Sequence, residues 1–224
     1  TRARCSGLRA AAGVIRILAT IVFAYLLGSV SGSLLLGRLR GVDIRTQGSG
    51  NAGGTNALRT QGFKFALVVM LVDVGKGALA TWMGLRAAGD GESALRLAMA
   101  CGFAAVLGHV WPLFHGFRGG KGVATVIGML LVLWPMLLLP MIGMFALMLL
   151  TTGYVGLGSI VAGFTMLPAV WLLERGQPRD EWLIVSVLVG VFLLFTHRAN
   201  VQRLRAGTEH RFERARVLAK LLRR

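Results

Sequence analysis

Two glycine-rich stretches hold the residues of this sequence best suited to chemistry. The first, residues 48–56, reads Gly-Ser-Gly-Asn-Ala-Gly-Gly-Thr-Asn and is followed by Arg59. The second, residues 117–125, reads Phe-Arg-Gly-Gly-Lys-Gly-Val-Ala-Thr. Glycine permits turns that point several backbone N–H groups at one anion, and arginine and lysine add positive charge. These stretches therefore predict two loops that bind phosphate groups.

Each loop has a simpler alternative. The first stretch could instead be a flexible linker, and the second could be a positively charged turn that fixes membrane topology. We favour anion binding because linkers rarely combine two asparagines, a threonine and an arginine at this spacing. The second loop is not an ATP-binding Walker loop, since Gly122 stands where that motif needs Ser or Thr. The residues predicted to bind substrate phosphate are Gly48, Gly50, Asn51, Gly53, Thr55, Asn56, Gly119, Gly120, Gly122 and Thr125.

Two further pairs of polar residues have helical spacing. Asp73 and Lys76 lie three residues apart within an apolar run and share one helical face. A charge at the membrane centre costs roughly 2.5–3.5 kcal/mol on insertion scales, so we expect these two to pair or to face a cavity. A structural ion pair and a substrate contact remain equal alternatives. His197 and Asn200 follow the last apolar run and are predicted to point together into a cavity.

The other histidines and the cysteines predict no chemistry. His109 and His115 flank a Trp-Pro turn, where structural roles are more common than catalytic ones. Cys5 and Cys101 have no metal-type spacing and are expected to be inert. The sequence therefore predicts no cofactor and no metal site.

The elements that must position these residues are membrane helices. Of the 224 residues, 55% are hydrophobic and 15% are charged, against roughly 25% charged in soluble domains. Mean hydropathy is +0.68. A net charge of +16 would suggest nucleic acid as the partner of a soluble protein, but here the basic residues flank apolar runs. That placement is typical of contact with anionic lipid headgroups and argues against nucleic acid.

The apolar runs predict an all-α integral membrane protein, a polytopic bundle of about seven transmembrane helices forming one domain over residues 1–224. The segments run over 17–37, 65–86, 94–113, 123–137, 138–152, 158–173 and 182–196. Residues 1–16 form a basic N-terminal segment, and residues 197–224 form a basic tail. Pro135 and Pro140 mark a turn between the fourth and fifth segments. The alternative there is one long kinked helix over 123–150 with a re-entrant end.

Charge predicts how the bundle is oriented. Segments 38–64 and 114–122 and the tail after residue 196 are rich in Lys and Arg, whereas 87–93 and 174–181 are close to neutral or acidic. Cytoplasmic loops carry an excess of Lys and Arg, which places both glycine-rich loops and the C-terminus in the cytoplasm and the N-terminus outside. The basic residues of the N-terminal segment oppose this orientation; they are Arg2, Arg4, Arg9 and Arg16. We give more weight to the later loops, which carry more basic residues.

Several short motifs occur along the chain in an order that is typical of one protein family. They are Gly-Ser at 28–29, Gly-Val-Asp-Ile-Arg at 41–45, the first loop with Ala-Leu-Arg at 57–59, Asp-Val-Gly-Lys-Gly at 73–77, Leu-Gly-His at 107–109, Gly-Gly-Lys-Gly-Val-Ala-Thr at 119–125, His-Arg-Ala-Asn-Val-Gln-Arg-Leu at 197–204 and Gly-Thr-Glu at 207–209. Over residues 26–209 the chain resembles the bacterial acyl-phosphate:glycerol-3-phosphate acyltransferases of the PlsY family. It departs from them at Ser31, where the family usually has proline. It also reads Gly-Tyr-Val-Gly at 153–156, where the family often has Arg-Tyr-Val-Ser.

The resemblance implies an enzyme and a reaction. A fatty acyl group passes from acyl phosphate to the 1-hydroxyl of glycerol 3-phosphate, giving lysophosphatidic acid and phosphate in the first acylation of phospholipid synthesis. The residues that the resemblance assigns to catalysis are Ser49, Arg59, Lys121, His197 and Asn200. Those expected to support them are Asp73, Lys76 and Glu209.

The chemistry of the donor fits this assignment. Acyl phosphate is already activated, so the protein mainly has to align the hydroxyl with the carbonyl and stabilise the oxyanion. The resemblance points to substrate-assisted catalysis, in which a substrate phosphate accepts the proton. Two roles are then open to His197: a general base, or a neutral hydrogen-bond donor that orients a substrate phosphate. We favour the second, because acyl phosphate is reactive and each substrate brings a phosphate able to take a proton. The expected partners are the two substrates and membrane lipids. The enzyme is expected to be a monomer in the bacterial cytoplasmic membrane, with its active site on the cytoplasmic side.

Two other functions compete with this one. A membrane transporter of an organic phosphate would also need anion-binding loops, but such proteins usually carry an internal repeat, and none is visible in this sequence. A lipid-binding structural protein is the third candidate.

Overall fold

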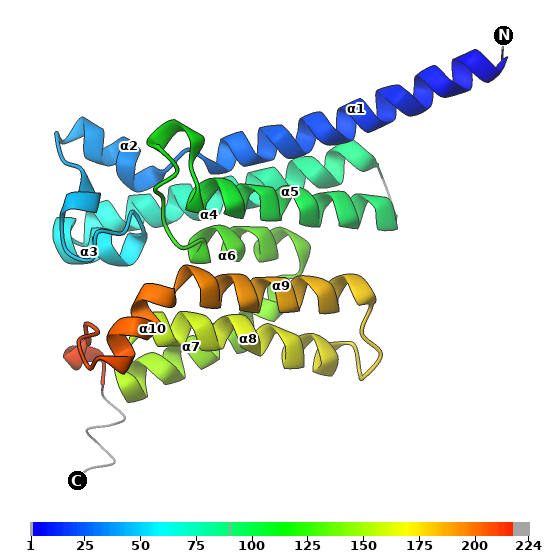
Figure 1. Cartoon of the computed structure of the whole chain (residues 1–224). Coiled ribbons are helices and arrows are strands. Elements are labelled where there is room, and N and C mark those ends of the chain that lie inside the picture. Colours follow the sequence, from blue (N-terminus) through cyan, green and yellow to red (C-terminus); the bar gives the residue numbers. More distant parts are fainter. Residues whose placement is uncertain (1, 90, 217–224) are drawn as a thin grey trace. The chain divides into compact units, whose positions relative to one another are not determined.

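The computed structural model describes residues 2–89 and 91–216, without the side chains of residues 2–10 and of residue 214. All regular elements within these ranges are helical, which confirms the predicted all-helical class for this part of the chain. The chain divides into two compact units (Figure 1), the first ending at Leu133 and the second beginning at Trp134. The prediction that residues 1–224 form one domain stays a prediction.

The first unit contains the two glycine-rich loops. Its helices are α1 (Arg2–Gly28), α2 (Gly32–Leu39), α3 (Gly54–Gln61), α4 (Phe63–Ala88), α5 (Glu92–Val110) and α6 (Val123–Leu133), with 3-10 turns at η1 (Ile44–Thr46) and η2 (Leu113–His115). Gly62, with φ +83°, separates α3 from α4. Because glycine adopts positive φ without strain, the chain changes direction there within one residue.

The predicted span 17–37 is not one helix. Helix α1 ends at Gly28, and α2 begins at Gly32. The Ser29 hydroxyl donates to the Tyr25 carbonyl, and the Lys76 ammonium of α4 donates to the Val30 carbonyl at 2.8 Å. A side chain that bonds a backbone carbonyl in this way replaces the lost helical bond, which is a known cause of helix breaks. The sequence prediction missed the break because all of these residues are apolar or small.

Glycine allows α1 and α5 to pack closely. A Cβ on Gly28 would overlap the backbone of Ala105, and one on Gly108 would lie 2.8 Å from the Ser29 nitrogen. Small residues are enriched at helix contacts in membranes because they let two backbones approach. The C-terminal ends of α1 and α5 therefore lie together.

The second unit contains the remaining helices. They are α7 (Leu138–Thr152), α8 (Val155–Leu173), α9 (Asp180–Thr196) and α10 (Arg198–Arg205), with 3-10 turns at η3 (Pro135–Leu137) and η4 (Glu213–Ala215). Pro135 starts η3, and Pro140 lies in the first turn of α7. The segment 123–150 is thus not one continuous helix, because α6 ends at Leu133 and Trp134 has φ −162°.

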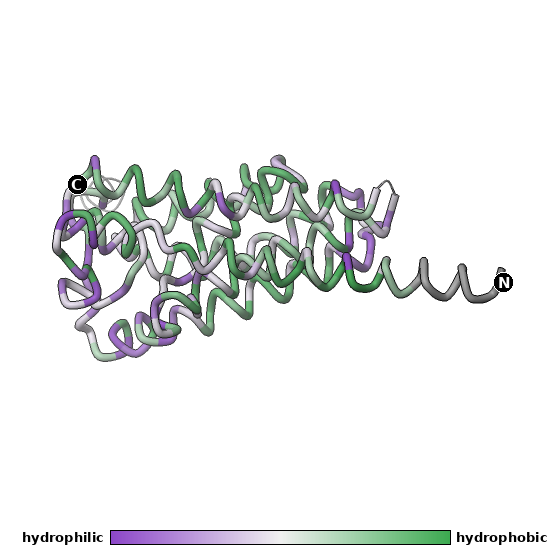
Figure 2. Tube along the Cα trace, turned by 90° about the horizontal axis from the view of Figure 1, so that it is seen from above, coloured by the Kyte–Doolittle hydropathy of each residue, from purple (hydrophilic) through white to green (hydrophobic). Residues whose placement is uncertain are grey.

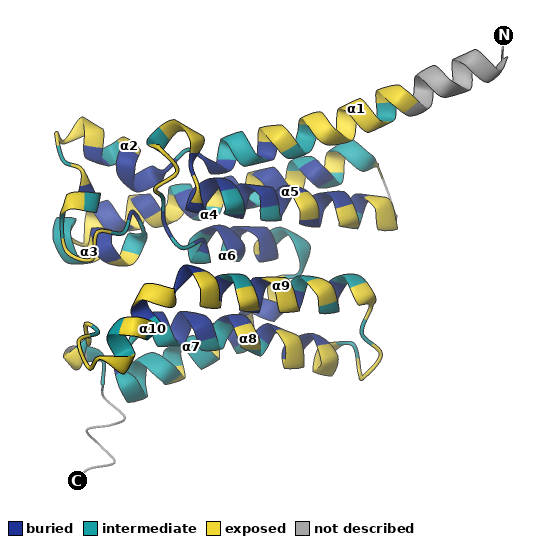
Figure 3. Cartoon of the chain, in the orientation of Figure 1, coloured by how far each residue is buried: buried dark blue, intermediate teal, exposed yellow. Residues whose placement is uncertain are grey.

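Several helices have the length and composition of membrane spans. Within the part of the chain that the structure describes, four stretches qualify by themselves: Ala11–Gly28, Glu92–His115, Pro135–Thr152 and Val155–Leu173. Helix α9 together with α10, bent by 57°, makes a fifth candidate. Figure 2 shows that hydrophobic residues dominate the helices and hydrophilic residues gather in the connections. In Figure 3 most of the described part of α1 is exposed or intermediate. Val14, Ile15 and Leu18 of this helix are 55%, 67% and 58% exposed, as expected for side chains that face lipid.

Part of the predicted topology depends on residues that the structure does not describe. Asp90, in the predicted outer connection 87–93, and the tail beyond residue 216 lie outside the described residues. The side chains of Arg2, Arg4 and Arg9, which oppose the predicted orientation, do so as well.

Candidate active site

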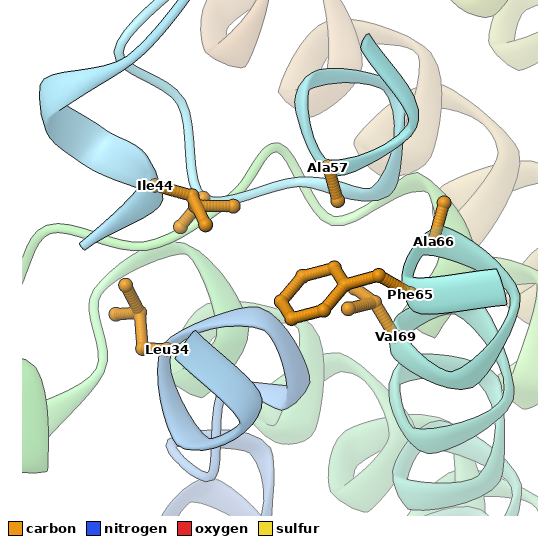
Figure 4. Close-up of a cluster of buried hydrophobic side chains, with 7 residues drawn as sticks. Leu34, Ile44, Ala57, Phe65, Ala66 and Val69 are labelled. Atoms are coloured by element: carbon orange, nitrogen blue, oxygen red, sulfur yellow. The ribbon is translucent and has the colours of Figure 1, made fainter. Parts of the chain in front are cut away.

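A small apolar core supports the first glycine-rich loop. Buried side chains from α2, η1, α3 and α4 meet beneath it (Figure 4); they are Leu34, Ile44, Ala52, Ala57, Phe65, Ala66 and Val69. The loop itself supplies one of them, Ala52, which is fully buried. The loop is therefore anchored to three helices and does not behave as the flexible linker that was its alternative.

Asn56 organises the same loop from within. Its Oδ1 accepts from the Ser49 nitrogen at 2.9 Å, and its Nδ2 lies 3.0 Å from the carbonyl oxygens of Ile44, Gln47 and Asn51. The side chain is buried, and these backbone partners satisfy both its amide oxygen and its NH2 group. Asn56 was predicted to bind phosphate, but in this structure its amide holds the loop in shape.

The side chains in and just after this loop that suit an anionic ligand are Ser49, Thr55 and Arg59. Ser49 and Thr55 are exposed, and Arg59 is partly buried. Thr55 and Arg59 lie four residues apart in α3, so they share one face of that helix. Gly48 and Gly50, with φ of +57° and +71°, give the loop the left-handed turns on either side of Ser49. A hydroxyl and a guanidinium thus lie next to an exposed turn, which is suited to binding an anion.

The second glycine-rich loop runs back along the end of α5. The Gly119 nitrogen donates to the Val110 carbonyl, and the Gly120 nitrogen donates to the His109 carbonyl, each at 3.1 Å. A Cβ on Gly120 would overlap the His109 imidazole and lie 2.8 Å from its Cε1. These two glycines, predicted to bind phosphate, are therefore needed for close packing, and a bound phosphate must take its N–H donors from other residues.

Those donors lie where the loop enters α6. Gly122 has φ +89°, and its carbonyl accepts from the Val126 nitrogen in the first turn of the helix. The N–H groups at a helix start attract anions, and Lys121 adds a positive charge directly before them. Thr125, in the same turn, is fully buried, and its hydroxyl has no hydrogen-bond partner among the described residues. The start of α6 thus combines a cation, helical N–H groups and a buried hydroxyl.

Arg45 connects the two loops. It follows Asp43 at the beginning of η1, three residues before the first loop. Its Nη1 donates to the carbonyl oxygen of His115 at 3.0 Å and lies 3.5 Å from that of Arg118 in the second loop. The same guanidinium forms an ion pair with Asp43 at 2.7 Å. This hydrogen-bonded pair lowers the pKa of Asp43 and raises the pKa of Arg45 from their ordinary values. The sequence analysis gave Arg45 no role, although its position just before the first loop was a usable signal.

The second unit holds His197 and Asn200. The His197 Nδ1 lies 2.8 Å from the Leu193 carbonyl oxygen. Since a carbonyl only accepts, this contact assigns the proton of the neutral ring to Nδ1 and leaves the lone pair on Nε2. A neutral His197 can therefore accept a proton or a hydrogen bond at Nε2, but it cannot donate one there. The expectation that a neutral His197 orients a substrate by donating a hydrogen bond does not fit this tautomer.

Glu209 holds Asn200 in place. Its Oε1 accepts from the Asn200 Nδ2 and its Oε2 accepts from the Arg203 Nε, each at 2.7 Å. Asn200 also packs against Gly156, where a Cβ would lie 2.7 Å from its Nδ2. The glycine at this departure from the family pattern leaves room for the amide. His197 and Asn200 are both buried, at the junction of α9 and α10.

Comparison with known proteins decides the family. A family model described as glycerol-3-phosphate acyltransferase matches residues 18–207. A glycerol-3-phosphate acyltransferase of Chlorobaculum tepidum is 40% identical over 225 residues, covering 88% of this chain and 97% of that protein. One of Shouchella clausii is 42% identical over 203 residues with the same coverage. The chain belongs to the glycerol-3-phosphate acyltransferase family.

Solved structures agree with this assignment. A crystal structure of PlsY, an integral membrane glycerol 3-phosphate acyltransferase, in its glycerol 3-phosphate form matches with a TM-score of 0.79 at 36% identity, covering 90% of this chain and 98% of that one. A second form of the same protein, with lysophosphatidic acid, matches with a TM-score of 0.77. The predicted family, enzymatic function and multi-pass membrane character are confirmed, and a transporter is not favoured.

Within this acyltransferase the predicted site residues fall into both units. Ser49, Arg59 and Lys121 belong to the first unit, and His197 and Asn200 belong to the second. In the first unit Arg45 ties the two loops to each other. Among the described residues no group of three His, Cys, Asp or Glu side chains has the arrangement of a metal site.

Proposed function

We propose that this acyltransferase takes its acyl group from acyl phosphate and transfers it to the 1-hydroxyl of glycerol 3-phosphate, releasing lysophosphatidic acid and inorganic phosphate. The observation that carries the proposal is the pair of loops in the first unit, each with features that bind phosphate and joined by Arg45. Two anion-binding loops suit a reaction in which both substrates carry phosphate. The exposed apolar side of α1 suits a protein that meets its acyl donor in lipid.

The two loops bind different substrate phosphates. Lys121 and the N-terminal turn of α6 bind the phosphate of glycerol 3-phosphate, with the Thr125 hydroxyl as a further donor. Ser49 and Arg59 bind the phosphate of the acyl donor, for which a guanidinium offers two parallel donors. The protein thereby aligns the hydroxyl with the acyl carbonyl, which by itself lowers the barrier.

His197 and Asn200 act on the attacking hydroxyl. The Nε2 of His197 accepts a hydrogen bond from that hydroxyl, because Nδ1 is held by the Leu193 carbonyl. The hydroxyl oxygen then bonds to the acyl carbon as its proton passes either to Nε2 or to a substrate phosphate, and the C–O bond from that carbon to phosphate breaks, so that phosphate leaves. Asn200, fixed by Glu209, orients the same substrate.

The decisive experiment uses the purified protein in detergent. With palmitoyl phosphate and glycerol 3-phosphate we expect release of phosphate and formation of lysophosphatidic acid without ATP. Palmitoyl coenzyme A in place of palmitoyl phosphate should give no product. Turnover with the coenzyme A ester and none with the phosphate would contradict the proposed donor.

We further propose seven transmembrane segments in a monomer in the bacterial cytoplasmic membrane, with the N-terminus outside and the site on the cytoplasmic side. The excess of Lys and Arg near both loops supports this orientation. Single cysteines at Ser49 and Gln177 should be labelled from opposite sides of intact membranes, after Cys5 and Cys101 have been replaced. Labelling of both from the outer side would contradict the orientation.

A further inference from the structure

Three ionisable side chains form a buried cluster in the first unit that the proposed chemistry does not use. Asp73 and Lys76 of α4 and His109 of α5 are 1%, 5% and 3% exposed. The Lys76 Nζ lies 2.8 Å from the Asp73 Oδ1 and 2.9 Å from the His109 Nδ1. Asp73 Oδ1 is also 3.4 Å from the same imidazole nitrogen. Each member thus contacts the other two.

Every donor of the ammonium group has a defined acceptor. Besides Asp73 and His109, Lys76 donates to the Val30 carbonyl at 2.8 Å, so its three N–H groups have three acceptors. Val30 lies in the break between α1 and α2, where the helical bond is missing. The Gly32 nitrogen on the far side of the break lies 3.5 Å from Asp73 Oδ1. The cluster therefore holds the end of α1 and the start of α2.

From α2 the contacts lead to the first loop. Ser33, one residue after Gly32, donates through its hydroxyl to the Ala52 carbonyl at 2.5 Å. Ser33 is fully buried, as is Ala52. The start of α2, which the cluster holds, is thus hydrogen-bonded to the first glycine-rich loop.

From His109 the contacts lead to the second loop. Because the ammonium donates to Nδ1, the neutral imidazole carries its proton on Nε2. That nitrogen faces Gly120, where no side chain larger than hydrogen fits. The carbonyl of His109 accepts from the Gly120 nitrogen as well. Lys121, the proposed phosphate ligand, is the next residue.

We infer that Asp73, Lys76 and His109 are positioning residues that hold the two phosphate-binding loops at a fixed separation, an inference that rests on the proposed function. Stability alone explains the cluster poorly, because replacing a buried ion pair by apolar side chains of similar size is often neutral or stabilising. What apolar side chains cannot do is bond the unpaired carbonyl in a helix break and orient an imidazole against a loop. Both substrates must be held within a fraction of an ångström for the hydroxyl oxygen to reach the acyl carbon, since a displacement of about 1 Å costs up to about 100-fold in rate.

The test separates charge balance from positioning. Lys76→Met alone leaves Asp73 as an uncompensated buried charge and is expected to destabilise the protein. The double variant Asp73→Asn with Lys76→Met removes both charges at nearly constant volume and should keep a Tm close to that of the parent protein. Its KM for glycerol 3-phosphate should nevertheless rise at least tenfold, because Val30 and His109 lose their donor.

A second variant serves if the double variant fails to fold. His109→Asn places an amide oxygen near the position of Nδ1, so Lys76 keeps its acceptor, but the side chain no longer reaches Gly120. We expect a near-parental Tm with a raised KM for glycerol 3-phosphate. Gly75→Ala is the matched control, since Gly75 lies in α4 between the two charged residues and a Cβ there meets nothing within 4 Å.

Kinetic constants with palmitoyl phosphate and glycerol 3-phosphate decide the outcome. A folded double variant, or a folded His109→Asn protein, with parental KM and kcat would overturn the inference and leave the cluster a structural ion pair. Loss of folding in His109→Asn, despite the retained acceptor, would also overturn it in favour of a purely structural role. Failure of the proposed function is distinguishable, because then the unmodified protein itself makes no lysophosphatidic acid from these substrates.

Discussion

Replacing Glu209 by glutamine tests how the C-terminal segment holds Asn200. The carboxylate accepts from two different donors, Asn200 Nδ2 and Arg203 Nε, each at 2.7 Å, and its side chain is 7% exposed. A glutamine has one oxygen and one NH2 group at the same positions. Whichever way the amide turns, its NH2 group faces a donor, so at least one of the two contacts is lost.

The expected cost follows from these contacts. Hydrogen bonds to charged groups contribute about 1.5–3 kcal/mol, and Glu209→Gln should destabilise the protein by about that amount. Asn200, packed against Gly156 and bonded to Glu209, should shift, and kcat/KM for glycerol 3-phosphate should fall at least tenfold. Thermal unfolding in detergent gives the first quantity, and phosphate release gives the second.

Glu213→Gln is the matched control from the same segment. Glu213 is paired with Arg216 at 3.1 Å, but its side chain is 58% exposed. Exposed ion pairs contribute about 0–1 kcal/mol, so this variant should keep both its Tm and its activity. Equal Tm values and equal kcat/KM in the two variants would refute the idea that Glu209 positions Asn200.

Four further predictions follow from single contacts. Lys121→Ala should lower kcat/KM for glycerol 3-phosphate by about 100-fold, corresponding to about 2–3 kcal/mol for a lost charge-assisted contact; parental kinetics would leave the lysine a topology signal only. If His197 only accepts a hydrogen bond, His197→Gln should retain at least a tenth of the activity between pH 5.5 and 8.5, whereas equal loss in His197→Gln and His197→Ala would indicate a general base. Gly120→Ala should raise KM for glycerol 3-phosphate because its Cβ overlaps the buried imidazole of α5, whereas Gly75→Ala should not. The hydrogen bond and ion pair with Arg45 lower the pKa of Asp43 from its ordinary value of 3.8, so this pair stabilises the protein fully above pH 3.8 and loses its effect as the pH falls through the lowered pKa of the folded protein. The difference in Tm between the parent protein and Asp43→Asn should therefore be present at pH 7 and vanish in strong acid.

The sequence could predict the class of fold and the two loops because both depend on local composition. Long apolar runs must become helices in lipid, where every backbone group has to find a partner within the chain. Each predicted apolar segment does contain a helix, from α1 in the first to α9 in the last. Glycines beside small polar residues and a cation likewise predict an anion-binding loop from local sequence alone.

The sequence could not predict which polar groups the protein uses for itself. Asn51, Asn56, Gly119 and Gly120 all looked suited to phosphate. The structure shows that Asn56 bonds four backbone groups between Ile44 and Asn51 and that the Asn51 side chain accepts from the Gly53 nitrogen. The two glycines donate to α5. Whether a donor is available to a ligand depends on which carbonyl lies opposite it, and the turns that bring that carbonyl into place are formed only by the folded chain.

The same reason explains the break in the first predicted span and the role of His109. Hydropathy over residues 17–37 is continuous, so nothing local marks the end of α1 at Gly28. The break is stabilised by Lys76, 46 residues further along the chain from Val30, and Lys76 in turn meets His109, 33 residues beyond it. Composition and spacing determined that this protein is a helical membrane protein with two glycine-rich loops, the family resemblance supplied the enzyme, and anion binding by the loops stays a prediction. Only the tertiary structure decided how a buried ion pair in α4 connects those loops, because hydrogen bonds and ion pairs act over about 3 Å in space irrespective of the separation of their partners in sequence.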